Sequence, residues 1–267
     1  MEKPKLWLSL EDRELLDRAL TQVKLEDFVT PRDVEGAAKA PPDDEGFWLS
    51  CHEGAWQLSA LEEPSWNPLV VDFLSEDWKF RAKRTWNSKE LLRDALGVKR
   101  GEKLKIMDGT AGLGADAFMM SLWGHEVIAY ERHPVLAFML MNAIERSREH
   151  YSELEGVGTV GAVGTEANVG EIALVEPDVL YLDPIYPEKK KSALNRKELR
   201  IVKKLVGIAE LSDEALSEYI LDSLPHVKKR IVVKRPTWSP RLPWKRGSPR
   251  MAEGKTTRFE IFDRILL

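Results

Sequence analysis

The feature that most constrains the fold is an alternation of short, apolar, β-branched segments with helical segments from residue 88 onward. Consecutive strands joined by helices pair in parallel and are covered on both faces, so this pattern predicts an α/β fold with a mostly parallel sheet. The expected strands are Leu104–Met107, Glu126–Tyr130, Val157–Val163, Val179–Leu182, Arg230–Lys234 and Arg258–Ile265. The expected helices are Ser88–Leu96, Ala115–Trp123, Pro134–Arg148 and Ser212–Leu224.

The residues before this pattern predict a separate N-terminal α+β extension, 1–87, followed by the main domain, 88–267. Short strands are expected at Phe47–Cys51, Ala55–Leu61 and Leu69–Phe73, the first two around a turn at Glu53-Gly54, with a helix over Ser9–Lys24. The stretch 29–46 is rich in Pro, Gly and Asp and is typical of a linker.

Composition excludes several classes of protein. Of 267 residues, 43% are apolar and 31% charged, and no apolar run approaches the roughly 20 residues of a membrane span. We therefore expect a cytoplasmic protein with no membrane partner. Its single cysteine, Cys51, excludes a disulfide within the chain, and the five histidines show no metal-ligand spacing, so no metal is expected.

The formal net charge of −4 conceals two unlike parts. Residues 184–267 carry a net charge of +10, whereas residues 1–183 carry −14. A basic C-terminal third predicts that one face of the protein binds a polyanion. On charge alone, a solvated lysine-rich surface is an equally good interpretation.

A glycine-rich loop, Asp108-Gly109-Thr110-Ala111-Gly112-Leu113-Gly114, joins the first expected strand of the domain to its helix. Glycines there allow a ligand to approach the backbone, and the helix N-terminus offers free N–H groups. Glu131 ends the next strand, where a carboxylate can accept hydrogen bonds from both hydroxyls of a ribose. The two features together predict a nucleoside-containing cofactor, without distinguishing NAD from other adenosine cofactors.

The motif Asp183-Pro184-Ile185-Tyr186 follows the fourth expected strand and decides between these cofactors. It resembles the D/N-P-P-Y/F motif of methyltransferases that act on exocyclic amines. The nitrogen of such an amine is a poor nucleophile because its lone pair is delocalised into the ring. If Asp183 and the Pro184 carbonyl accept its two N–H bonds, the lone pair is directed at the methyl group, while Tyr186 stacks on the base.

Several further segments resemble RsmJ, a bacterial family of small-subunit ribosomal RNA guanine-N2 methyltransferases. The similarity runs from about Val70 to the C-terminus, with motifs in the same order and at similar spacing. The matching segments are Asp108–Phe118, Glu131–Pro134, Tyr181–Leu194 and Val232–Pro236.

This resemblance implies a class I, Rossmann-like methyltransferase fold with a seven-stranded sheet. It implies methylation, dependent on S-adenosylmethionine (SAM), of the N2 amine of a guanine near the 3′ end of 16S ribosomal RNA, alone or in the small ribosomal subunit. The residues expected at the cofactor are Asp108, Gly109, Gly112, Gly114, Ala115, Asp116, Glu131, Arg132, Thr165, Glu166 and Asp183. The residues expected to act on the base are Asp183, Pro184 and Tyr186.

The basic third supplies the candidate RNA contacts. Cations suit phosphates, and tryptophans in a proline-rich loop suit bases. The candidates are Lys189, Lys190, Lys191, Lys234, Arg235, Trp238 and Trp244.

Three alternatives remain open. An enzyme with the same motif could methylate adenine N6 or another amine. A nicotinamide oxidoreductase would explain the glycine-rich loop but leaves Asp183 to Tyr186 unexplained. A non-catalytic RNA-binding protein could retain the same fold.

Overall fold

A computed structural model describes residues 6–8, 45–84, 90–152, 154, 158–164, 167–186, 197–207 and 212–264. Its centre is a seven-stranded sheet in the order β10-β11-β9-β8-β5-β6-β7. Strands β9, β8, β5, β6 and β7 run parallel, while β11 is antiparallel to both β9 and β10, so the predicted mostly parallel sheet is confirmed. The strands are β5 (Lys105–Asp108), β6 (Glu126–Tyr130), β7 (Thr159–Gly164), β8 (Val179–Leu182), β9 (Arg230–Pro236), β10 (Arg250–Glu253) and β11 (Thr257–Asp263).

Helices cover both faces of this sheet. The side chains of each strand alternate between two hydrophobic cores, as the period of two in a strand requires. For example, Tyr181 packs in the core beneath α4, whereas Leu180 and Leu182 pack in the core beneath α8. The first face carries α3 (Leu91–Leu96), α4 (Ala115–Leu122) and α5 (Pro134–Ser152); the second carries α6 (Val169–Val175), α8 (Asp213–Ser223) and the turn η2 (Leu224–His226).

A second, four-stranded sheet is formed by N-terminal residues. Its strands β1 (Leu6–Leu8), β2 (Phe47–His52), β3 (Ala55–Ala60) and β4 (Leu69–Val70) lie in that order. The predicted hairpin is confirmed, and Glu53 and Gly54 at its turn both have positive φ, as a two-residue hairpin turn demands. The third predicted strand is shorter than expected, because the chain leaves the sheet after Val70 to bury Val71 and Phe73.

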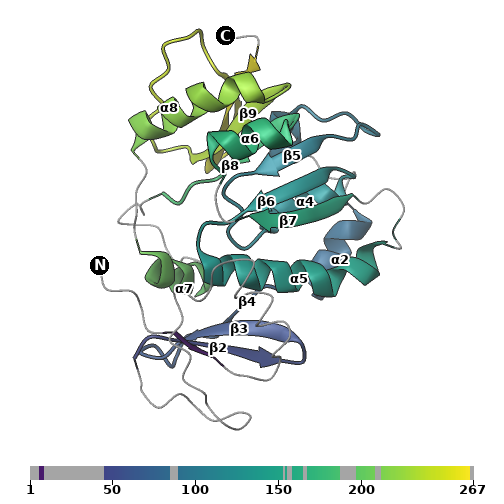
Figure 1. The fold of residues 1–267 in the computed structure, drawn as a ribbon, viewed down its shortest axis with the longest axis vertical. Coiled ribbons are helices and arrows are strands. Elements are labelled where there is room, and N and C mark those ends of the chain that lie inside the picture. Colours follow the sequence, from purple (N-terminus) through teal and green to yellow (C-terminus); the bar gives the residue numbers. More distant parts are fainter. Residues whose placement is uncertain are drawn as a thin grey trace.

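Helix α5 lies between the two sheets, as Figure 1 shows, with the small sheet in purple at the bottom. Trp56 of β3 packs edge-on against Phe138 at 5.0 Å between ring centroids. The side-chain amide of Asn142 accepts a hydrogen bond from the backbone N–H of Trp56 and donates one to the Gly54 carbonyl. Contacts on two sides explain why the first half of this helix is apolar nearly all round, unlike a surface helix.

Five strands and α-helices were not predicted: β1, β10, α2 (Glu76–Lys83), α6 and α7 (Lys197–Val206). Strand β10 is a half-exposed edge strand of four residues, too short for a clear alternation, and is held by its pairing with β11. Helix α7 packs Ile201, Val202 and Leu205 inward, and Lys204 forms an ion pair with Glu62 beside the small sheet. The expected helix Ser9–Lys24 and most of the expected linker 29–46 lie outside the described residues.

The described residues hold neither a membrane-spanning helix nor a metal-binding cluster. In that part of the chain, no helix is long and apolar enough to cross a membrane. The same residues contain no group of three or more His, Cys, Asp and Glu side chains arranged to hold a metal ion.

Candidate active site at the carboxyl edge of the sheet

The predicted site residues gather at one edge of the large sheet. Asp108 ends β5, Glu131 follows β6, Asp183 follows β8, and Lys234 lies near the end of β9. These strands are parallel neighbours, so their carboxyl ends share an edge. Open α/β sheets bind their ligands outside that edge.

The glycine-rich loop is held against the sheet by its own backbone. The Gly109 N–H donates to the Tyr181 carbonyl at 2.9 Å, and the Ala111 N–H donates to the Tyr130 carbonyl at 2.8 Å. Gly114, the N-cap of α4, has φ +76°, and a Cβ there would lie 2.3 Å from Leu140. Gly114 therefore permits a close approach between α4 and α5.

The neighbouring Gly112 faces open space instead. Its φ is +55°, and a Cβ at this position would meet nothing within 4 Å. Ala115, the first residue of α4, is exposed. The loop therefore leaves its backbone at Gly112 and the N-terminus of α4 open to a ligand.

Glu131 is nearly buried, and two backbone groups orient its carboxylate. The N–H of His133 donates to Oε1 at 2.7 Å, and the N–H of Gly112 donates to Oε2 at 2.9 Å. Burial raises the pKa of Glu131, and these two hydrogen bonds oppose the shift. A carboxylate has about four lone-pair sites, so it retains capacity to accept hydroxyl donors from a ribose.

Asp183 is linked to its neighbours by a lysine that we had predicted to bind RNA. The Lys234 ammonium donates to the Asp183 carboxylate at 2.8 Å and to the Asp116 carboxylate at 2.7 Å. The buried Tyr181 hydroxyl donates to the same Asp116 oxygen at 2.5 Å. The backbone N–H of Asp183 is held by the Thr110 hydroxyl, also at 2.5 Å.

Burial and charge act together on the acidic groups of this cluster. Burial raises the pKa of Asp183 to about 6, against the opposing effect of Lys234. The pKa of Asp108 is also raised well above its usual range, chiefly by burial. For Lys234, burial would lower the pKa, but the charges of Asp183 and Asp116 outweigh it and raise the pKa.

Tyr186 lies half-buried beside Asp183, and the Arg235 guanidinium covers its ring at 5.1 Å from the centroid. A base can therefore stack only on the other face of this ring. Its hydroxyl is buried and has no hydrogen-bond partner among the described residues. Pro184 is half-buried in the same loop.

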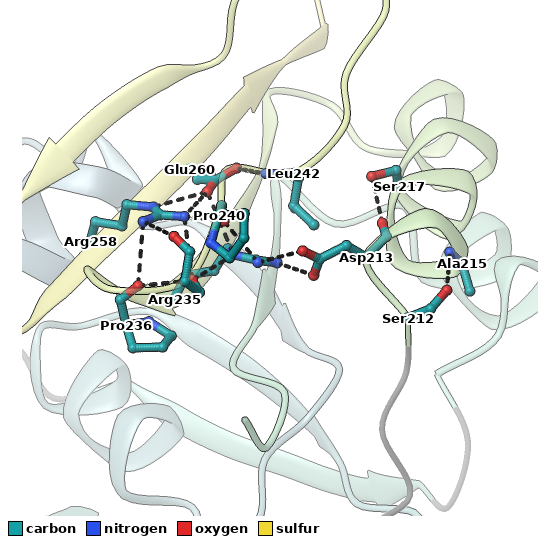
Figure 2. Close-up of polar contacts among 11 residues, drawn as sticks. Ser212, Asp213, Ala215, Ser217, Arg235, Pro236, Pro240, Leu242, Arg258 and Glu260 are labelled. Carbon is teal, nitrogen blue, oxygen red and sulfur yellow. Dashed lines mark hydrogen bonds and ion pairs between the residues drawn. The ribbon is translucent and has the colours of Figure 1, made fainter. Parts of the chain in front are cut away.

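Arg235 corrects one of our predictions. Its side chain is 1% exposed and forms a two-pronged ion pair with Asp213, at 2.8 and 2.9 Å. Its neighbours Glu260 and Arg258 are also buried, and Figure 2 shows both arginines converging near Glu260 and the Pro240 carbonyl. The positive charge of this guanidinium is paired inside the protein. The prediction that Arg235 contacts RNA therefore does not fit the structure.

The other predicted RNA contacts divide between surface and interior. Trp238 is 43% exposed in the loop that follows β9, at the same sheet edge as Asp183. Trp244 is half-buried, packs edge-on against Phe262 and donates its indole N–H to the Arg246 carbonyl. Five predicted site residues lie outside the described residues: Thr165, Glu166, Lys189, Lys190 and Lys191. Arg132, predicted at the cofactor, is exposed.

Sequence reasoning missed three contributors to this site. Thr110 lies within the glycine-rich loop, but its hydrogen bond with the backbone N–H of Asp183 links two residues that are 73 positions apart in the chain. Tyr181 orients Asp116 across 65 residues. The signal for Lys234 was present in the strand Ile231-Val232-Val233-Lys234, since alternation places Val232 and Lys234 on one face.

These residues suit a cofactor that carries a ribose and a positive charge. Two carboxylates, those of Asp116 and Asp183, share one ammonium, so this cluster is negative overall and favours a cation such as a sulfonium. Open space at Gly112 and the restrained Glu131 carboxylate provide for the nucleoside part.

Comparison with known proteins agrees with this geometry. A family model described as "Putative SAM-dependent methyltransferase" matches residues 37–264. The ribosomal RNA small subunit methyltransferase J of Pseudoalteromonas atlantica is 36% identical over 229 residues, covering 81% of this chain and 85% of the relative. That of Thioalkalivibrio sulfidiphilus is 36% identical over 217 residues, covering 80% and 82%.

Among solved structures, a SAM-dependent methyltransferase from Neisseria gonorrhoeae superposes with a TM-score of 0.63 at 24% identity, over 97% of this chain and 96% of its own. This likeness confirms the methyltransferase fold. The family decides for SAM over NAD, and the resemblance drawn from the motifs is confirmed. The chain belongs to the SAM-dependent methyltransferase family that includes the ribosomal RNA small subunit methyltransferases J.

Proposed function

We propose that this protein transfers a methyl group from SAM to the exocyclic N2 amine of a guanine near the 3′ end of 16S ribosomal RNA. The observation that carries the proposal is the position of the Asp183 carboxylate, at the same sheet edge as the glycine-rich loop and Glu131. The names of the curated relatives support ribosomal RNA as the substrate. The choice of guanine N2 rests on a sequence resemblance to RsmJ. This resemblance covers the segment Asp183–Tyr186 and the residues that follow it.

We propose a division of labour among the cofactor residues. Glu131 binds the ribose hydroxyls, the backbone of Gly112 and Ala115 lies along the cofactor, and Asp108 and Asp116 lie on the side of the positive charge. SAM, when bound, supplies an electrophilic methyl group attached to a sulfonium. Thr165, Glu166 and Arg132 remain proposed contacts of the same cofactor.

Asp183 and the Pro184 carbonyl accept the two N–H bonds of the target amine. This orientation directs the nitrogen lone pair at the methyl carbon; the new nitrogen–carbon bond forms as the carbon–sulfur bond breaks. The nitrogen then loses a proton to Asp183 or to water. The face of the Tyr186 ring away from Arg235 stacks on the base, and Arg235 on the opposite face holds the ring in place.

The loop after β9 supports an RNA substrate. It begins at the sheet edge that holds Asp183 and carries Trp238 together with exposed cations at Arg241, Lys245 and Arg246. Cations bind phosphates at any sequence, and an exposed indole stacks on an unpaired base. These contacts, with Lys189 to Lys191, would place the RNA beside the motif.

A methyl-transfer assay with nucleoside mass analysis tests the proposal. Small ribosomal subunits and naked 16S RNA from a strain lacking the protein are incubated with the purified chain and isotopically labelled SAM. We expect one labelled N2-methylguanosine per RNA. Labelled N6-methyladenosine would move the specificity to adenine, whereas tight RNA binding without transfer would show a non-catalytic binding protein.

A further inference from the structure

A single lysine bridges two carboxylates at the candidate active site. Lys234 Nζ lies 2.8 Å from Asp183 Oδ2 and 2.7 Å from Asp116 Oδ2. Neither the motif nor the assigned cofactor contacts accounts for this cation. Its side chain is 28% exposed, and two of its three N–H donors are engaged by these carboxylates.

The register of the sheet fixes this arrangement. Leu182 of β8 pairs with Val233 of β9, so Asp183 and Lys234 are the next residues along two parallel neighbours and point to the same face. That face carries α4, whose first turn contributes Asp116. The three side chains therefore come from three elements that the core holds rigidly.

Charged and titratable groups face Asp183 from every element packed against it. Lys234 comes from β9, Asp116 from α4 and Asp108 from β5, while Tyr181 and Tyr186 flank Asp183 along its own chain. Without the lysine, the carboxylates of Asp116 and Asp183 would face each other with no positive charge between them. Like charges at this separation favour protonation, and a protonated Asp183 offers one acceptor fewer.

We propose that Lys234 is a positioning residue for methyl transfer: its ammonium fixes the Asp183 carboxylate in one orientation and keeps it ionised to receive the amine. This inference rests on the proposed function of Asp183. Lys234 itself touches neither the base nor the methyl group. Asp116 anchors the lysine from the far side, and Tyr181 orients Asp116.

The pH dependence of the single-turnover rate tests this role. In Lys234→Met, we expect the rate at pH 7 to fall about 10-fold to 100-fold, mostly because the Asp183 carboxylate loses its fixed orientation. We also expect the acid limb of the profile to move up by about one pH unit, because a nearby opposite charge typically shifts the pKa of a carboxyl by 1–3 units. Raising the pH should restore part of the rate. Lys234→Arg keeps the charge and should keep the limb in place. Lys99→Met, at an exposed lysine before β5, is the matched control and should change neither quantity.

A second measurement reads the same contact without any turnover. Urea unfolding at pH 7.5 is followed for Lys234→Met, Asp183→Asn and the double variant. We expect Lys234→Met to lower the midpoint, because two carboxylates lose their counterion, and Asp183→Asn to restore much of the loss in the double variant. Additive effects would mean that the two side chains do not interact.

The outcomes separate this inference from the proposed function. If the wild-type chain methylates no RNA while the unfolding experiment shows coupling, the proposed function fails and the contact stands. If the wild type is active but Lys234→Met keeps both its rate and its acid limb, the positioning role is overturned. A limb that moves equally in Lys234→Arg and Lys234→Met would also overturn it, since charge would then not be the cause.

Discussion

Two ionic clusters lie on opposite faces of the same strand end. On the α4 side, Lys234 binds Asp116 and Asp183, and the three side chains are 28–36% exposed. On the α8 side, Arg235 binds Asp213 and Glu260; the guanidinium and the Glu260 carboxylate are only 1–2% exposed. Consecutive residues of one strand thus enter two different environments.

The balance of charge differs between the clusters as well. On the α8 side, two arginines face two carboxylates, and backbone carbonyls of Ser239 and Pro240 take up remaining guanidinium N–H groups. On the α4 side, one lysine pairs with two carboxylates, those of Asp116 and Asp183. A sealed, neutral cluster serves stability, whereas an open cluster with excess charge is typical of a functional site.

The largest effect should follow from removing the carboxylate of the open cluster. Asp183→Ala is expected to lower the single-turnover rate by about 1,000-fold or more, because the amine loses its oriented acceptor. Cofactor affinity should largely survive, and stability should change little since Lys234 retains Asp116. Labelled methyl transfer and calorimetry with S-adenosylhomocysteine measure both. An undiminished rate would contradict the assigned role.

The sealed cluster should respond in the opposite way. Arg235→Met removes the ion-pair partner of Asp213 and leaves Glu260 with Arg258 alone, so the free energy of unfolding should fall by about 3 kcal/mol in urea denaturation. Arg250→Met breaks an exposed ion pair with Asp263 and should cost less than about 1 kcal/mol. Equal losses in the two variants would remove the distinction between the clusters.

Glu131 lies at the same edge of the sheet as the open cluster, and its role in cofactor binding can be tested separately. Glu131→Ala should weaken S-adenosylhomocysteine binding about tenfold, as expected for the loss of one charge-assisted hydrogen bond. Calorimetry measures the affinity. Glu131→Gln retains one acceptor oxygen for the backbone N–H groups of Gly112 or His133, so it separates ligand binding from loop support. Unchanged affinity in both variants would remove Glu131 from the cofactor site.

The smallest effect is the pH dependence of the wild type. In the proposed mechanism the ionised Asp183 carboxylate accepts from both Lys234 and the amine, and its pKa is raised to about 6. The single-turnover rate should therefore be full well above pH 6, fall to half at about pH 6 and decline further in more acidic solution. Asp183→Asn has no proton to gain and should lack this limb. A limb that persists in Asp183→Asn would assign it to another group.

Much of the fold followed from local patterns. Strands β6 and β8 have the predicted bounds, and α3 ends at Leu96 as predicted, where Gly97 has a positive φ. The edge strand β10 was missed, because its four residues carry no clear alternation and its stability comes from β11.

The residues of the candidate site also divide into those that local sequence patterns reveal and those whose roles depend on the tertiary structure. Asp108, Glu131 and Asp183 were recognisable because each ends a strand, and strand ends are visible in a single sequence. The roles of Lys234 and Arg235 were not, since two adjacent basic residues look alike until the neighbouring helices are placed. Arg235 was predicted to meet RNA and instead joins β9 to the N-terminus of α8.

The sequence by itself therefore determined which residues sit at the carboxyl edge of the sheet and which reaction class they suit. Alternation along a strand and the residue types of the motifs are local properties, so they can be recognised in the sequence without a structure. Only the tertiary structure decided which charges neutralise one another, because Coulomb interactions depend on distances and burial between residues 51 to 118 positions apart in the chain. Packing of α4 on one face and α8 on the other made Lys234 part of the candidate site and Arg235 part of the core.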